Sequence, residues 1–230
     1  MLDFVNTSTF FSICLTLVAF GIGTLLQKKW KFAILNPILL GAVLVIAVLK
    51  LFQIPNEVYQ AGCQLLTFLI TPATICLAIS CYTQFQTLKS HLPAILLGVI
   101  VGTVCSLSSV YLLCLAFGLD KALTMSLLPK SVTTAIGVAL SQELGGLAAV
   151  TTAVIIFTGI LGNILGPTLC KLLRLTEPTA QGVAFGTASH VVGTAKAAQL
   201  GELTGAVSSF SLTLAGLLTA LFLSFLAQFL

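Results

Sequence analysis

Charged residues are scarce in this chain of 230 residues, which has ten lysines and arginines and six aspartates and glutamates. They make up 7% of the sequence, whereas a soluble domain carries about 25%. Apolar residues make up 58%, and the mean hydropathy is +1.14. This composition excludes an ordinary soluble domain, and the scattered lysines form no basic patch for nucleic acid. We therefore predict an integral membrane protein embedded in a lipid bilayer.

Motifs of catalysis and cofactor binding are also missing from the sequence. It contains no HExxH, GxSxG or phosphate-binding GxxxxGK[ST] pattern. The seven cysteines form no CxxC pair and are best explained as small packing residues. The few acidic residues fall mostly in the predicted loops, away from the apolar segments. We therefore predict that the protein is not an enzyme and has no catalytic residue, no cofactor and no metal site.

Apolar segments of about 20 residues, the length that spans a bilayer as a helix, follow one another along the chain. Eight can be drawn, at residues 4–26, 32–52, 61–82, 92–118, 122–141, 147–173, 182–201 and 203–229. The connectors are short, so successive helices are expected to be neighbours. We predict an all-α polytopic membrane protein with seven or eight hydrophobic segments, forming one integral membrane domain over residues 1–230.

Three of the segments contain helix breakers and are poor candidates for continuous spans. They are 61–82 with Pro72, 122–141 with Pro129, and 182–201 with Gly193. A cleaner apolar segment follows each one, an alternation that resembles the discontinuous helices of inverted-repeat secondary transporters. Membrane proteins carry more loop lysines and arginines on the cytoplasmic side of the membrane than on the other side. This chain shows such an excess on one side only if one of the two proline-broken segments enters the membrane and returns to the side it came from. We predict one re-entrant segment.

The stretch SLLPKSVTTAIGVALSQ places a proline and a lysine side by side within an apolar segment. A lysine at this depth costs about 2.5–3.5 kcal/mol. Pro129 interrupts the helix and exposes the N-terminus of its second half, where free N–H groups and the helix dipole attract anions. Ser131, Thr133 and Thr134 add hydroxyls beside Lys130. We predict an anion-binding site here. The alternative is that Lys130 neutralises a buried acid or lies near the membrane surface.

The break at Pro72 is flanked by Thr71 and Thr74, again a proline among hydroxyls but without a charge. It is either a simple proline kink or a second half-helix end that faces Lys130 and contributes to substrate binding.

The stretch GTASHVVGTAK supplies three more candidate substrate-binding residues, His190, Thr194 and Lys196. A histidine titrates near neutral pH and suits proton coupling. The alternative is a structural histidine bonded to a backbone carbonyl. Glycines at positions 159, 162 and 166 form a small-residue face typical of close helix packing, which makes a homodimer a further hypothesis.

The blocks LLPKSVTTAIGVALSQELGG, TGILGNILGP and GVAFGTASHVVGTAKAAQLGE resemble the signature blocks of the LrgB/CidB family of antiholin-like proteins. The resemblance extends from about residue 30 to the end of the chain. Two departures remove helix breaks: Ala135 stands where the family usually has a proline, and Ile79-Ser80 replaces its usual Val-Pro pair.

The resemblance implies two functions. The family is named for control of murein hydrolases and autolysis in the bacterial cytoplasmic (inner) membrane, together with a holin-like partner of the LrgA/CidA type. Plant relatives carry glycolate and glycerate across the plastid envelope, and bacterial relatives are linked to pyruvate or similar carboxylates. We predict a transporter of small carboxylate anions, coupled to protons through His190. The antiholin-like regulator is the alternative.

Overall fold

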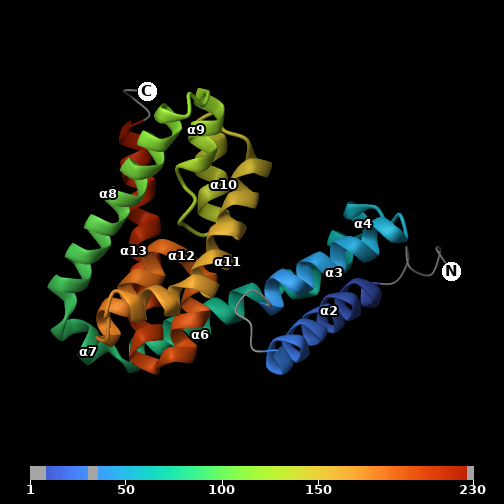
Figure 1. The fold of residues 1–230 in the computed structure, drawn as a ribbon, viewed down its shortest axis with the longest axis horizontal. Coiled ribbons are helices and arrows are strands. Elements are labelled where there is room, and N and C mark those ends of the chain that lie inside the picture. Colours follow the sequence, from blue (N-terminus) through green and yellow to red (C-terminus); the bar gives the residue numbers. More distant parts are fainter. Residues whose placement is uncertain (1–8, 31–35, 227–230) are drawn as a thin grey trace. The chain divides into compact units, whose positions relative to one another are not determined.

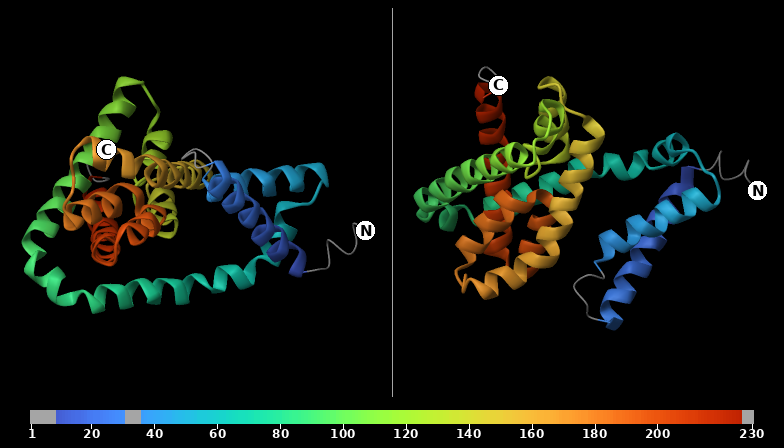
Figure 2. Two further views of the ribbon diagram at one scale, coloured as in Figure 1. Left: turned by 60° about the horizontal axis from the view of Figure 1, so that its bottom comes forward. Right: turned by 45° about the horizontal axis from the view of Figure 1, so that its top comes forward.

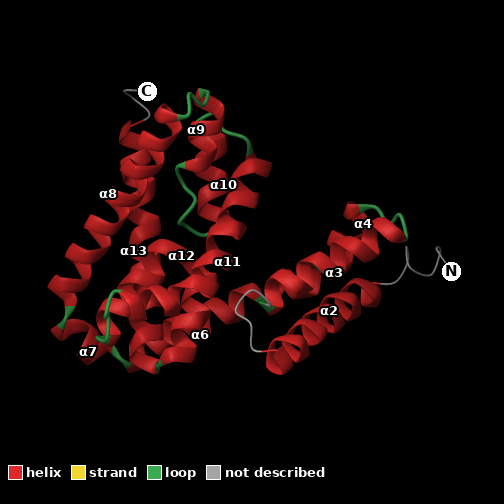
Figure 3. Cartoon of the chain, in the orientation of Figure 1, coloured by secondary structure: helices red, strands yellow, loops and turns green. Residues whose placement is uncertain are grey.

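The computed structural model describes residues 9–30 and 36–226, and all regular secondary structure within them is helical (Figure 3). The chain divides into two compact units, residues 1–76 and 77–230. Among the described residues, four helices are long and apolar enough to cross a membrane: α2, α8, α11 and α13. These findings confirm the prediction of an all-α polytopic membrane protein.

The first unit is built on an antiparallel pair of helices. Its elements are α2 (Thr9–Trp30), α3 (Pro37–Leu51), α4 (Asn56–Gly62), α5 (Gln64–Phe68) and the first part of α6 (Ile70–Thr83). Gly23 of α2 lies against Pro37, and Gly41 of α3 lies against Phe20. The missing side chains let the two backbones approach closely, as membrane helices often do.

The predicted break at Pro72 lies three residues after the actual interruption. Helix α5 ends at Phe68, α6 begins at Ile70, and Pro72 stands in the first turn of α6. A proline has no N–H to donate to the carbonyl four residues earlier, which is that of Phe68, and it is tolerated in a first helical turn. The side chains of Thr71 and Thr74 lie outside the part that the structure describes.

The second unit contains three long helices and two shorter excursions (Figure 1). Its elements are α7 (Phe85–Ser90), α8 (Leu92–Ala116), α9 (Lys121–Leu127), α10 (Thr134–Glu143), α11 (Ala148–Leu172), α12 (Pro178–Leu200) and α13 (Glu202–Leu226). Helices α8 and α13 run in the same direction, because Ile95 packs with Val207 near their starts and Cys114 packs with Leu223 near their ends. Helix α11 runs in the opposite direction (Figures 1 and 2).

Helices α9 and α10 form a re-entrant hairpin, the first hairpin (residues 121–143). Its tip is the non-helical stretch 128–133, which contains Pro129. The Leu147 amide, just before α11, donates to Ser126 Oγ of α9 at 2.7 Å, so the chain returns from the tip to the level of the last turn of α9. A hairpin of this form is what the prediction of one re-entrant segment requires; that residues 121–143 enter and leave the bilayer on the same side stays a prediction.

Helix α12 forms a second re-entrant hairpin (residues 178–200), which the sequence analysis did not predict. Gly182 and Ala198 both lie against the first turns of α13, although a straight helix would place them about 24 Å apart. The chain reverses at Ser189 and His190, whose backbone angles are non-helical. The second hairpin begins and ends beside the start of α13, so it enters from the end opposite to the first hairpin.

The predicted break at Gly193 was therefore wrong in its position, whereas the expectation that residues 182–201 form no continuous span agrees with the reversal. Gly193 has helical backbone angles, and its missing side chain serves packing instead. A Cβ at Gly193 would meet the Phe185 carbonyl oxygen at 2.9 Å and would clash with the Ser189 side chain. The glycine allows the two halves of the hairpin to fold against each other, while the reversal itself falls three to four residues earlier.

The two ends of the first hairpin are expected on one side of the membrane. Cysteines introduced as F117C and E143C, each alone in a cysteine-free background, should react with an impermeant maleimide from the same side. A cysteine at Lys171 should react from the other side. Reaction of F117C and E143C from opposite sides would mean that residues 122–141 cross the bilayer.

Basic residues gather at the end of the second unit where α8 begins, called the basic end below. Lys89 precedes α8, and Lys171 and Arg174 lie in the last turn of α11 and in the connection to α12. Lys121 lies at the other end, where α8 leads into α9. Because loop lysines and arginines favour the cytoplasmic side, we expect the basic end to face the cytoplasm.

Candidate functional site

The tips of the two hairpins meet midway along α8 and α13. Between them lies a cavity of about 10 Å³, lined by Thr103, Ser106, Leu107, Leu128, Ser131, Val132, Thr187, Ala215 and Thr219. A cavity of this size holds about one water molecule. Five of the lining side chains carry hydroxyls, so this is a polar site in the middle of an apolar bundle. It is called the tip cavity below.

The ammonium group of Lys130 lies at this site, half-buried in the tip of the first hairpin. Its Nζ donates to Ser131 Oγ at 3.0 Å and to Ser106 Oγ at 3.5 Å. The two serine oxygens are 3.1 Å apart. Among the described residues, no carboxylate lies within ion-pair distance of Lys130, so the alternative of a buried acid finds no support in that part of the chain. Because its partners are neutral hydroxyls, the ammonium group of Lys130 keeps its positive charge unpaired and can bind an anion.

Two helix N-termini point toward the same region. Helix α10 begins at Thr134, and the returning half of α12 begins after His190. Thr133 occupies the N-cap position of α10, but its side chain makes no capping hydrogen bond. The first amides of α10 therefore keep their N–H groups available, and each N-terminus adds a partial positive charge. The pairing predicted from the sequence was with the break at Pro72, and it stays a prediction; within the second unit, the other N-terminus is that of the returning half of α12.

His190 and Thr194, both predicted to bind substrate, are bonded within the second hairpin and to its neighbours. The His190 ring is 4% exposed, and its Nε2 lies 2.9 Å from the Ile155 carbonyl oxygen of α11. Thr194 Oγ1 donates to the His190 carbonyl at 2.9 Å and lies 2.8 Å from Ser208 Oγ. These bonds satisfy polar groups that the chain reversal exposes, which irregular backbone requires at this depth.

The remaining predicted residues lie around the tip or away from it. Ser131 lines the tip cavity, whereas Thr134 is exposed at the start of α10. Lys196 lies on the returning half of α12, where its Nζ donates to Gln199 Oε1 at 3.1 Å. Of the residues predicted to bind substrate, Lys130 and Ser131 therefore lie at the tip cavity. Thr194 and Lys196 instead bond to neighbouring residues of α12.

Four hydroxyl residues of the tip cavity were missed by sequence reasoning: Thr103, Ser106, Thr187 and Thr219. Thr103 is 3% exposed, and its Oγ1 has no hydrogen-bond partner. Thr187 Oγ1 donates to the Val183 carbonyl at 2.7 Å. The spacing of positions 103 and 106 on one face of an otherwise apolar helix was the signal that could have identified two of them.

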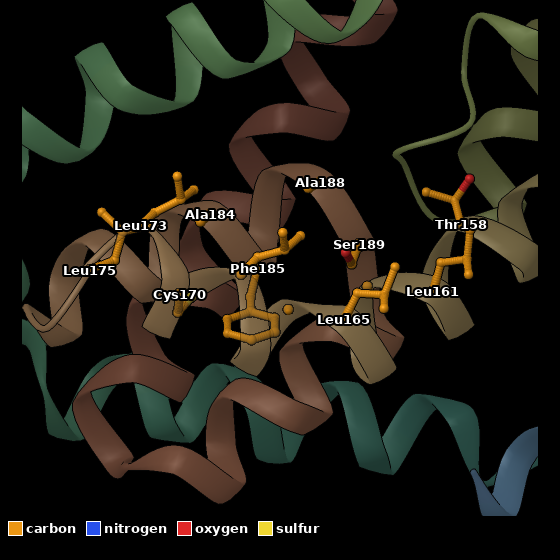
Figure 4. Close-up of a pocket in the computed structure, with 13 residues that line it drawn as sticks. Thr158, Leu161, Leu165, Cys170, Leu173, Leu175, Ala184, Phe185, Ala188 and Ser189 are labelled. Carbon is orange, nitrogen blue, oxygen red and sulfur yellow. The ribbon is translucent and has the colours of Figure 1, made fainter. Parts of the chain in front are cut away.

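An apolar pocket of about 330 Å³ between α11 and the first half of α12 is a poor candidate for an anion site (Figure 4). Leucines such as Leu161 and Leu165 line it, and Figure 4 shows Phe185 beside them. None of the lining side chains is charged. Side chains of the same chain occupy the space beside the glycines of this face, because Gly162 lies against Ser189 and Gly166 lies against Phe185.

These features define a class: a polytopic membrane protein in which two re-entrant hairpins enter from opposite ends and meet at a lysine. The chain belongs to the LrgB-like family, which it matches over residues 16–229. This confirms the resemblance seen in the sequence.

Relatives in several bacilli are named antiholin-like protein LrgB. The proteins of Bacillus mycoides (strain KBAB4), Bacillus cereus (strain B4264) and Bacillus anthracis (strain CDC 684 / NRRL 3495) are each 38% identical to this chain over 211 residues. The matched region covers 91% of this chain and 92% of each relative. No solved structure matches the chain significantly.

Proposed function

We propose that this chain has the antiholin-like role for which its relatives are named, in a bacterial cytoplasmic membrane and together with a holin-like partner of the LrgA/CidA type. The support is the family membership and the names of relatives that match nearly the whole chain. This is the broader of two proposals, and it rests on likeness alone.

The geometry of the tip cavity supports a more specific molecular activity, the transport of small carboxylate anions. The observation that carries this proposal is Lys130, a half-buried ammonium group bonded to Ser106 and Ser131. Burying an unpaired charge is costly, and a carboxylate bound beside it offsets that cost through charge-assisted hydrogen bonds. Opposed re-entrant hairpins with N-termini at the membrane centre are also typical of secondary transporters.

The hydroxyl lining favours carboxylates that carry a second polar group, such as glycolate, glycerate or pyruvate. Thr103 offers an unpaired hydroxyl to the substrate. In the present closed state the cavity has room for about one water, so the hairpin tips must separate to admit a substrate.

Proton coupling through His190 belongs to the same proposal. It is argued from the effect of a negatively charged substrate on the protonation of the His190 ring. His190 lies at the reversal of the second hairpin, whose tip meets the tip of the first hairpin that carries Lys130. A carboxylate bound between them would make a second positive charge on the His190 ring more favourable. Substrate and proton would then bind together.

Uptake into proteoliposomes tests the carrier proposal. Labelled glycolate, glycerate and pyruvate should enter with a saturable rate, and unlabelled D- and L-glycerate should compete unequally. Control liposomes without the protein provide the background. A rate that rises in proportion to concentration, without saturation or competition, would contradict a carrier and leave the antiholin-like role as the function.

The two proposals also differ in their response to one variant, K130M, examined with a holin-like partner. If autolysis control depends on transport, K130M should lose both uptake and control. If it depends on assembly with the partner, K130M should keep control and still copurify with the partner. Substitutions at Gly162 or Gly166 cannot make this distinction, because those glycines pack within the chain.

The variant T103V should raise stability and lower substrate affinity. Valine has nearly the shape of threonine but leaves no buried hydroxyl unpaired, so stability should rise by about 1 kcal/mol. If the hydroxyl binds substrate, the apparent affinity for glycolate should fall by about three- to tenfold. Thermal unfolding and uptake kinetics of the same preparation measure both effects. An unchanged affinity would exclude Thr103 from the binding site.

A further inference from the structure

We infer that the substrate reaches Lys130 from the basic end, through a cavity between α8 and α12, and that the tip of the second hairpin is the gate at its inner end. The inference rests on the proposed carrier function and adds the route and its gate.

The cavity, called the vestibule below, has a volume of about 700 Å³. Its lining comes from residues 91–102 and 177–187 and includes His91, Ala94, Val101, Glu177 and Thr187. Two glycines of α8 allow α12 to approach closely along one wall of the vestibule, because a Cβ at Gly98 would lie 3.1 Å from Val183 Cγ1 and one at Gly102 would lie 3.4 Å from Thr187 Oγ1. The volume lies within the range of small-molecule sites.

The inner end of the vestibule adjoins the tip cavity. Thr187 lines both spaces, so it lies in the partition between them. A Cβ added at Gly102 would lie 3.4 Å from Thr187 Oγ1, which shows how closely α8 approaches the partition. On the far side, the next residue, Thr103, holds its unpaired hydroxyl in the tip cavity. An orphaned buried hydroxyl at this point indicates a place where a ligand completes the hydrogen bonding.

The partition belongs to a segment with a built-in hinge. Thr187 stands two residues before the reversal at Ser189 and His190. His190 has a φ of 42°, a left-handed value that is strained for a residue with a side chain. Hinges that open binding sites are a few residues that absorb such dihedral changes. A change at His190 would move Thr187 relative to α8 and connect the two spaces.

The charges at the mouth suit an anion. His91 and Glu177 line the mouth, where α8 and α12 begin. Three basic residues lie at this end, Lys89, Lys171 and Arg174, and they outnumber the two carboxylates there, those of Glu177 and Glu202. A cleft with excess positive charge raises the local concentration of anions.

Cysteine labelling tests this route. In a cysteine-free background, A94C and V101C line the vestibule, and I100C is the matched control because Ile100 is exposed on another face of α8. A negatively charged, membrane-impermeant methanethiosulfonate reagent should modify A94C and V101C and spare I100C, because a thiol in hydrocarbon does not ionise. Glycolate at about ten times its Kd should slow the modification of V101C by about tenfold.

Two results would overturn the route. The first is a lack of labelling at both A94C and V101C, which would mean that lipid or protein fills the vestibule. The second is labelling that glycolate does not slow while the same protein still binds glycolate, which would place the route elsewhere. Failure of the carrier function is recognised separately, by the absence of glycolate binding to the cysteine-free parent.

Discussion

Replacing Lys130 by methionine is expected to lower the uptake of glycolate by about 30-fold or more while leaving the protein folded. Removing one partner of a buried charge pair costs about 2–5 kcal/mol, and each 1.4 kcal/mol is a factor of ten. Methionine keeps most of the length of the side chain but cannot donate to a carboxylate. The measurement is initial uptake into proteoliposomes at a fixed low concentration of substrate.

Stability should change in the opposite direction in K130M. Without substrate, Lys130 is a half-buried charge with only hydroxyl partners in the described part of the chain. A neutral side chain removes the cost of holding that charge. The melting temperature of substrate-free K130M should therefore equal or exceed that of the unmodified protein. The control is K50M, since Lys50 is exposed in the last turn of α3 and should affect neither property. A misfolded K130M would instead assign Lys130 a structural role.

The second large effect is expected at the packing of the second hairpin on α13. A Cβ at Gly186 would clash with the Ser208 carbonyl oxygen and would meet Ser211 Cβ at 2.8 Å and the Leu212 amide nitrogen at 3.0 Å. Two of these three atoms belong to backbone and cannot rotate away. G186V should therefore destabilise the protein by about 3 kcal/mol or more, at the upper end of overpacking effects.

The readout for G186V is the yield of monodisperse protein in size-exclusion chromatography and its unfolding temperature. G21A is the matched control, because a Cβ at Gly21 would meet nothing within 4 Å. Alanine also has a higher helix propensity than glycine, so G21A should be neutral or stabilising. Wild-type behaviour of G186V would mean that α12 does not pack against α13 in this way.

The sequence predicted the first hairpin well because its signals are local. Pro129 removes a backbone N–H, and Lys130 cannot lie in lipid, so both mark an interruption wherever the segment lies in the fold. The count of basic loop residues then favoured a re-entrant course for one of the two proline-broken segments.

The second hairpin has no such signal. No proline stands at its reversal. Two contacts from α11 stabilise the segment instead: the His190 ring lies against the Ile155 carbonyl, and the Asn163 side-chain amide donates to the Val192 carbonyl. Local propensity favoured Gly193 as the break, because glycine is the residue that most weakens a helix. In the structure, Gly193 instead lets the two halves of the second hairpin approach each other closely. No pattern in a single sequence indicates this role.

The same distinction applies to the candidate site. Lys130 and Ser131 were identified because they adjoin a visible break. Thr103 and Ser106 come from a different helix, and hydroxyls in a membrane helix usually bond to their own backbone. Their position in the tip cavity depends on how α8 packs against the hairpin tips, which is a property of the fold.

The most direct test of the central claim is the thermal shift of the purified protein on addition of small organic acids. Glycolate at about 100 times its Kd should stabilise the unmodified protein by about 2.7 kcal/mol. Its neutral analogue glycolamide should have no effect, and glycolate should not stabilise K130M. An equal shift in K130M, or an equal shift with glycolamide, would show that no carboxylate binds at Lys130.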